Sequence, residues 1–182
     1  MKYIETAFVQ LAFAWKLYNY ALEGKIKLDE LDIPLTFQEG RMVLVLPDRV
    51  FDTPDDLIIA LENNLTITFG AAAITLNRCR EEAGLRLADP IETELDQFVG
   101  LTYQIRNAFA HVIAEPRWNI TNPRFARHYR FGGVRVDPTS VGDKIFQYQD
   151  IGGPDVLFHM KAYGDTNVWP NHSFQWIAYG AR

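Results

Sequence analysis

A single long helix between Thr53 and Gly84 constrains the fold of this chain more than any other feature. Apolar residues recur there at three- and four-residue spacing, which is typical of a helix with one buried face; they are Leu57, Leu61, Leu65, Phe69, Ala72, Leu76 and Cys79. Thr53, Pro54 and the two following acids form a strong helix start, and Gly84 is a left-handed stop that Leu85 can pack against. A helix this long needs other long helices to cover its apolar face.

Two further helices are expected on either side of it in the sequence. The first covers about residues 3–23 and ends at Gly24; its main stripe is Ile4, Phe8, Leu11, Trp15, Tyr18 and Leu22. Val9, Phe13 and Leu17 add a second apolar stripe, so we expect this helix to be covered on more than one side. The other helix is expected to be capped by residues 89–92, with Glu92 in a capping box, and to run towards Pro116.

Shorter β segments are expected in two places. Residues 33–46 are predicted to form a hairpin around Glu39-Gly40, in which Leu35 and Phe37 face the apolar residues 42–44. After Pro116 the composition changes: residues 118–135 are irregular and rich in Arg and aromatics, and residues 144–149 and 156–163 are predicted to be strands. The fold class is therefore mainly α. We expect a bundle of three long helices over residues 1–116 with an inserted β-hairpin, and a β-containing extension, residues 117–182, that packs on the bundle.

The most informative stretch for function is Gln104-Ile105-Arg106-Asn107-Ala108-Phe109-Ala110-His111, near the predicted end of the third helix. The predicted core seam of this helix is Phe98, Leu101, Ile105, Phe109 and Val112. Asn107 and His111 are four residues apart and nearly opposite the seam, so they should lie one turn from each other. Tyr103, Ala110 and Ala114 lie beside them, and the long stem of Arg106 can reach the same place.

Arg, Asn and His form a sensible set for cleaving RNA without a metal ion. The ribose 2′-hydroxyl must attack the adjacent phosphorus, and a histidine can move protons near neutral pH. Arg can hold the phosphate and stabilise the charge that develops, and Asn can orient either group by hydrogen bonds.

The segment from Arg106 to His111 resembles the R-x4–6-H motif of HEPN domains, in the form where Arg is followed by Asn, Asp or His. The resemblance covers about residues 3–114. It implies an all-α bundle, a homodimer in which the motif helices of two subunits face each other, and metal-independent endoribonuclease activity of the toxin or phage-defence type. It further implies that His111 is the acid/base, Arg106 the phosphate clamp and Asn107 the orienting residue, with Tyr103, Ala110 and Ala114 at the dimer interface. The inserted hairpin and the extension depart from a minimal HEPN bundle.

Two other interpretations are open. The dimer can be catalytically silent and bind RNA or a partner protein such as a cognate antitoxin. The same Arg and His can also be a solvated last helical turn, where basic residues suit the helix dipole; a helical ligand-binding bundle is a remoter option.

A basic segment follows the motif. Residues 101–135 contain six arginines and one acid, a net charge of +5 in a chain whose net charge is −5. This asymmetry favours a phosphate-bearing partner, and the residues expected to contact RNA are Arg117, Arg124, Arg127, Arg130 and Tyr129. The alternative is a structural arm that wraps the bundle with its aromatics buried.

The remaining composition predicts no cofactor and no metal site. His128, His159 and His172 lack the spacing and the Cys or acid neighbours of a metal centre, and the single Cys79 is expected to be a buried apolar residue. The N-terminus lacks a signal-peptide pattern, and we expect no membrane-spanning run. We therefore expect a cytoplasmic protein.

Overall fold

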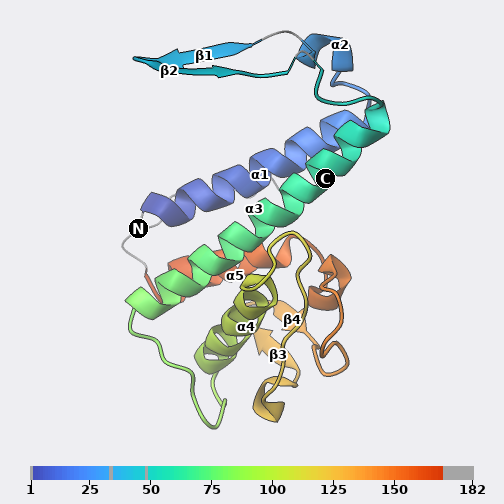
Figure 1. The fold of residues 1–182 in the computed structure, drawn as a ribbon. Coiled ribbons are helices and arrows are strands. Elements are labelled where there is room, and N and C mark those ends of the chain that lie inside the picture. The colour runs from blue at the N-terminus through green and yellow to red at the C-terminus, as the bar shows by residue number, and fades with distance from the viewer. Residues whose placement is uncertain (1, 33–34, 48, 170–182) are drawn as a thin grey trace, which may run out of the picture.

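A computed structural model describes residues 2–32, 35–47 and 49–169, and it is mainly helical, as expected (Figure 1). The α-helices are α1 (Lys2–Leu22), α2 (Leu28–Leu31), α3 (Pro54–Glu82), α4 (Glu94–Phe109) and α5 (Val156–Asn167). The strands are β1 (Thr36–Glu39), β2 (Met42–Val45), β3 (Tyr129–Phe131) and β4 (Val134–Val136), and two 3-10 helices are η1 (Pro123–Phe125) and η2 (Tyr148–Ile151).

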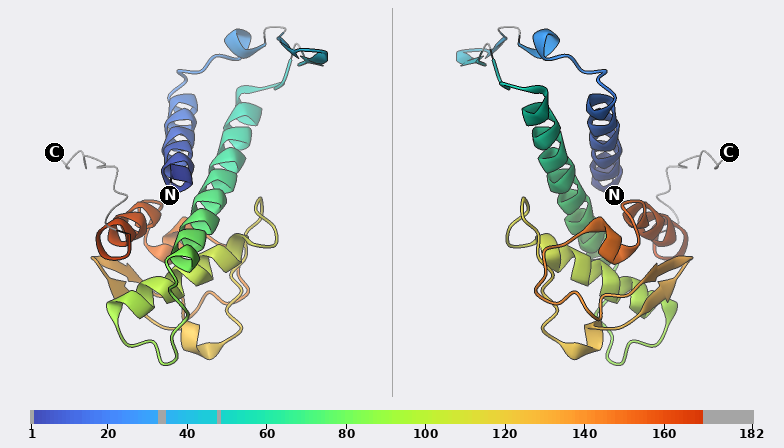
Figure 2. Two further views of the ribbon diagram at one scale, coloured as in Figure 1. Left: turned by 90° about the vertical axis from the view of Figure 1, so that its left-hand side faces the viewer. Right: turned by 90° about the vertical axis from the view of Figure 1, so that its right-hand side faces the viewer.

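Helices α1 and α3 run side by side in opposite directions, and the β1–β2 hairpin stands at one end of this pair (Figure 1). The other end of α3 packs against α4 and α5, and the β3–β4 hairpin packs on α4 and α5 (Figure 2). Ile4, Phe8 and Leu11 of α1 are buried, as the first stripe predicted. The expectation that the second stripe is covered is wrong for Val9 and Phe13, which are 50% and 59% exposed.

The long helix forms for the reasons that its sequence indicates. The Asp56 N–H donates to Thr53 Oγ1 at 3.3 Å and the Thr53 N–H donates to Asp56 Oδ2 at 2.8 Å, which closes a capping box. At the other end Gly84 has φ +75°, and the Leu85 N–H donates to the Arg80 carbonyl at 3.2 Å. This is a Schellman stop. The predicted stripe is buried except for Leu61, which is half-buried.

Helix α4 is shorter than expected at both ends. Its N-cap is Thr93, in a capping box with Asp96, so the predicted cap at residues 89–92 is wrong. The helix stops at Phe109 because the Ala108 carbonyl, which a continuing helix would use, accepts the Arg117 N–H at 3.0 Å instead. Phe98, Leu101, Ile105 and Phe109 are buried, whereas Val112 lies beyond the helix and is 54% exposed.

The C-terminal extension differs from its prediction in both strands. Residues 156–163 belong to helix α5, whose buried residues Val156, Leu157, Met160, Lys161 and Gly164 follow a helical period and not an alternating one. Residues 144–149 contain an isolated bridge, Arg117 with Ile145, and the start of η2. The β-hairpin of the extension is β3–β4, which turns at Gly132-Gly133 with φ +49° and +86°.

One core joins the two predicted parts of the chain. Phe8, Phe69 and Phe98 of the helices belong to the same buried cluster as Trp118 and Leu157 of the extension. The extension therefore packs on the helices as far as the described residues reach; residues 170–182, with His172, lie outside them.

Helix α3 is long and apolar enough to cross a membrane, by length and composition alone. Core helices of soluble proteins pass the same test, and a third of its most apolar window is buried in this fold. Its buried face packs against α1 and α4. The fold therefore gives only weak support to a membrane span.

Candidate functional site

The predicted catalytic residues lie at the C-terminal end of α4 and just beyond it. Arg106 and Asn107 are half-buried in the last turn, where Arg106 Nη1 donates a hydrogen bond to Asn107 Oδ1 at 3.1 Å. His111 follows the C-cap residue Ala110 and is exposed. Asn107 and His111 are therefore not stacked one turn apart on a helix, because the helix ends between them.

His111 lines the wall of a surface hollow of about 340 Å³. Two groups that can contact a phosphate, Arg117 and Asn119, line the same hollow, together with the carboxylates of Glu115 and Asp143. Arg117 Nη2 donates to Glu115 Oε1 at 2.9 Å, and both side chains are more than half exposed, so this ion pair is a weak competitor for an incoming anion.

Packing of the extension fixes the floor of this hollow. Trp118 is 1% exposed, and its indole N–H donates to Asp150 Oδ2 at 2.8 Å. The Asp143 N–H donates to the Trp118 carbonyl at 3.1 Å, which holds Asp143 at φ +61°, a left-handed conformation that is uncommon for a residue other than glycine. Sequence reasoning missed Asn119 and Asp143, because long-range contacts bring them to His111.

Arg106 and Asn107 do not line the hollow that contains His111. Ala108 does line it, and Ala108 projects about 200° around the helix from Arg106. Arg106 instead lies close enough to Arg80 for its charge to affect the pKa of Arg80. Burial lowers that pKa, the carboxylate of Glu81 raises it, and the positive charge of Arg106 lowers it further. Within one chain Arg106 and His111 therefore lie on different surfaces of the protein.

The surface on the Arg80 side is also hollow and basic. A depression of about 480 Å³ is lined by Arg80, Arg86 and Tyr103, and also by Glu81, whose Oε1 lies 3.1 Å from Arg80 Nη2. Arg80 is 5% exposed and donates to the Leu85 carbonyl at 2.8 Å and to Asn77 Oδ1 at 2.6 Å, so it is fixed by the end of α3.

Two of the arginines predicted to bind RNA have structural partners. Arg124 Nη1 pairs with Asp89 Oδ2 at 2.9 Å, and the guanidinium lies 4.7 Å from the centre of the Phe125 ring. Arg127 Nη1 donates to the Ile91 carbonyl at 2.7 Å. Both side chains therefore bind the extension to the segment that precedes α4, at Asp89 and Ile91.

The aromatics of this segment are buried, as the structural-arm alternative expected. Trp118, Phe125 and Tyr129 are at most 5% exposed, and the Tyr129 hydroxyl donates to the Phe125 carbonyl at 3.0 Å. The Tyr129 ring therefore cannot stack on a base in this conformation.

Arg130 is exposed, and its cross-strand partner is Arg135. Like charges directly opposite each other destabilise a strand pair. Neither guanidinium has a hydrogen-bond or ion-pair partner among the described residues. Two unpaired arginines on one exposed face provide a ready contact for a phosphate backbone. The alternation of Tyr-Arg-Phe and Val-Arg-Val about Gly132-Gly133 was the overlooked sequence signal for this pair.

The residues predicted at a dimer interface are only partly free. The Tyr103 ring is half-buried, with its centre 5.6 Å from that of Phe125. Ala110 and Ala114 are exposed, but Ala114 lies in the turn after the helix.

Other candidate chemistry is limited. Cys79 is buried, and burial raises the pKa of its thiol, so it is not a reactive nucleophile. No group of three or more His, Cys, Asp or Glu side chains in the described ranges is arranged to hold a metal ion.

Comparisons of the chain with protein-family models, with curated proteins and with solved structures found no match.

Proposed function

We propose that this protein is a metal-independent endoribonuclease of the HEPN type that acts as a homodimer in the cytoplasm. The observation that carries the proposal is the exposed His111, which lies in one hollow with Arg117 and Asn119. These groups supply a proton carrier, a phosphate ligand and a hydrogen-bonding amide without a metal ion.

The proposed reaction is an internal transesterification. The ribose 2′-oxygen loses its proton and bonds to phosphorus, while the bond from phosphorus to the 5′-oxygen breaks and that oxygen takes up a proton. The products are a 2′,3′-cyclic phosphate and a 5′-hydroxyl. His111 carries one of the two protons and a water molecule from solvent carries the other, while Arg117 stabilises the charge on the phosphate oxygens.

Arg106 and Asn107 enter this scheme through the second subunit. The HEPN resemblance implies that the ends of the two motif helices face each other in the dimer. The Arg106–Asn107 pair of one subunit would then approach the partner's His111, which its own chain holds away from that pair. The RNA strand beyond the site would contact Arg130 and Arg135.

The test compares two histidine variants in a cleavage assay on mixed RNA in EDTA. His111→Ala should lose at least a hundredfold of the wild-type rate, because general acid–base catalysis contributes about 10²–10⁴-fold. His159→Ala is the matched control: His159 is an exposed histidine of α5, outside the hollow, and its removal should leave the rate unchanged. Unchanged cleavage by His111→Ala would overturn the assigned role.

One observation favours a second function, a catalytically silent dimer that binds RNA or a partner protein such as an antitoxin. The Arg106 guanidinium is bonded to Asn107 and lies outside the hollow of His111, so a single chain does not assemble the motif. For this function the purified protein should bind RNA with a steep dependence on salt and leave it intact.

A further inference from the structure

The β1–β2 hairpin has one face that is entirely apolar along most of its length. Its register pairs Phe37 with Leu44 and Glu39 with Met42, and the Leu46 N–H donates to the Leu35 carbonyl at 2.9 Å. Cross-strand partners lie on the same face of a hairpin. The apolar face therefore consists of Leu35, Phe37, Met42, Leu44 and Leu46, with Glu39 at its turn end. The opposite face carries Thr36, Gln38, Val43 and Val45.

Nothing else in the described chain covers this apolar face. Its five apolar residues are between 39% and 57% exposed, and none of them belongs to the buried core. A two-stranded hairpin is at best marginally stable alone in water, and contiguous apolar patches of this size on soluble proteins are often functional. The face is therefore a candidate contact surface.

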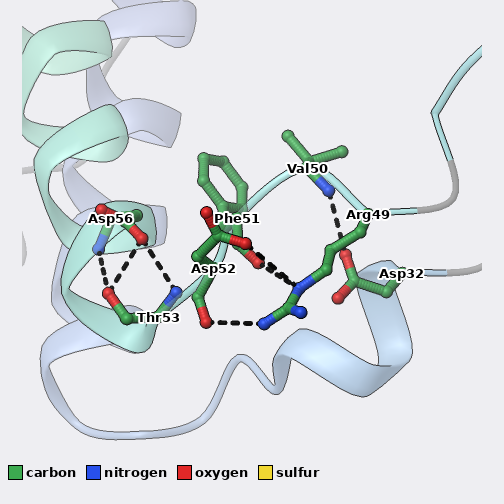
Figure 3. A network of polar contacts seen from close by, with 7 residues as sticks. All are labelled: Asp32, Arg49, Val50, Phe51, Asp52, Thr53 and Asp56. Carbon is green, nitrogen blue, oxygen red and sulfur yellow. Dashed lines mark hydrogen bonds and ion pairs between the residues drawn. The ribbon is translucent and has the colours of Figure 1, made fainter.

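The base of the hairpin is tied to the start of α3 by a polar network (Figure 3). Asp32 Oδ1 accepts the Val50 N–H at 3.2 Å, and Arg49 donates to the Phe51 carbonyl at 3.2 Å and to the Asp52 carbonyl at 2.8 Å. These contacts link the two chain segments that flank the hairpin, which Figures 1 and 2 show projecting from one end of the α1–α3 pair.

We propose that two copies of this chain associate by packing the apolar faces of their hairpins against each other about a twofold axis. The five residues of each copy expose roughly 500 Å², so two faces would bury about 1,000 Å², the lower bound for a specific interface. A twofold contact requires a surface that is complementary to itself. With the hairpins antiparallel, the two Glu39 carboxylates lie at opposite ends of the contact and do not oppose each other.

The charge around the hairpin argues against an anionic membrane or a nucleic acid as the occupant. Residues 23–56 carry nine acids and four bases, a net charge of −5, whereas the hairpin residues 35–46 contain one acid and one base. An acidic surround repels phosphate, and the face that would meet its copy carries a single charge, that of Glu39 at its turn end. This association uses a surface other than the end of α4, and it does not depend on nuclease activity.

The test is sedimentation velocity of the wild type and of two variants at neighbouring positions. Leu44 and Val43 are 53% and 56% exposed and lie on opposite faces of the same strand, so Leu44→Asp and Val43→Asp are matched changes. We expect Leu44→Asp to halve the number of subunits in the assembly relative to the wild type and Val43→Asp: from four to two if the α4 contact of the proposed function also forms, and from two to one if it does not. Circular dichroism should show the same helix content in all three proteins.

Amide hydrogen exchange provides a second measurement that needs no substitution. Exchange of peptides covering residues 35–46 should quicken when the wild type is diluted until it dissociates. Three results would overturn the proposal: a monomeric wild type, whether or not it floats with neutral phosphatidylcholine vesicles; an assembly whose size Leu44→Asp leaves unchanged; or equal dissociation by both variants. The second result would favour contact through α4, and the third would favour pairing of strand edges.

Discussion

Gly70 in α3 lies where this helix meets the end of α4, and a methyl group there has no room. A Cβ atom built on Gly70 lies 2.5 Å from Phe109 Cδ1 and 2.8 Å from Ile113 Cγ1. The Phe109 ring cannot move aside easily, because it is 1% exposed and its centre lies 4.9 Å from that of Phe146 and 5.5 Å from that of Phe69. Gly70→Ala should therefore displace the residues that lead to His111.

The magnitude follows from two opposing effects. Overpacking a close-packed core destabilises the protein by about 1–3 kcal/mol, whereas replacing a helical glycine by alanine stabilises the helix by about 0.5–1 kcal/mol. We expect Gly70→Ala to lower the free energy of unfolding by about 1–2 kcal/mol, and Tm by about 2–8 °C for a chain of this size.

Urea unfolding followed by circular dichroism measures this change. Gly142→Ala is the matched control, because a Cβ at Gly142 meets no atom within 4 Å; its stability should equal or slightly exceed that of the wild type. A Gly70→Ala protein as stable as the wild type would refute the tight approach of α3 to Phe109 and Ile113.

Three further predictions concern the cap of α4, a buried charge and the basic hairpin. Thr93→Ala should lower the free energy of unfolding by about 1 kcal/mol. The hydrogen bonds from Thr93 also lower the pKa of Asp96. In urea titrations the stability advantage of wild type over Asp96→Asn should therefore be full at pH 6 and shrink below about pH 4. Lys161→Met should cost about 3–5 kcal/mol in the same assay, because the 2%-exposed Lys161 contacts two carboxylates at 2.7 and 2.8 Å, which would lose their counter-charge. Arg130→Ala should weaken RNA binding and reduce the slope of log affinity against log salt by about 1, whereas Arg124→Ala, which removes an ion-paired arginine, should change the slope less; equal slopes for both would contradict the contact.

Local sequence signals predicted the elements whose causes are local. The Thr53 cap, the Gly84 stop and the turn of the β1–β2 hairpin depend on residues within one or two turns, and the structure confirms all three. The apolar seam of α4 is confirmed for the same reason as far as Phe109, since its period is a property of the helix itself.

Elements that depend on distant contacts could not be predicted in this way. Helix α4 ends early because the Ala108 carbonyl accepts the N–H of Arg117, and no residue near Phe109 signals this. The short apolar run from residue 156 fits an alternating pattern and a helical one equally well, and packing against the core selects the helix.

The candidate site shows the same division. The sequence identifies His111, Arg106 and Asn107, but only the early end of α4 places His111 beside Arg117, Asn119 and Asp143, on a different surface from Arg106. The pairing of Arg130 with Arg135 follows from the register of the β3–β4 hairpin, whereas the sequence pattern predicts irregular chain over residues 118–135.

The most direct test of the proposed function is analysis of the RNA ends produced by the purified wild-type protein in EDTA. We predict 2′,3′-cyclic phosphate and 5′-hydroxyl ends that appear with wild type and are lost with His111→Ala. RNA that stays intact with a folded wild-type dimer, or cleavage that needs a divalent metal and leaves 3′-hydroxyl ends, would contradict it.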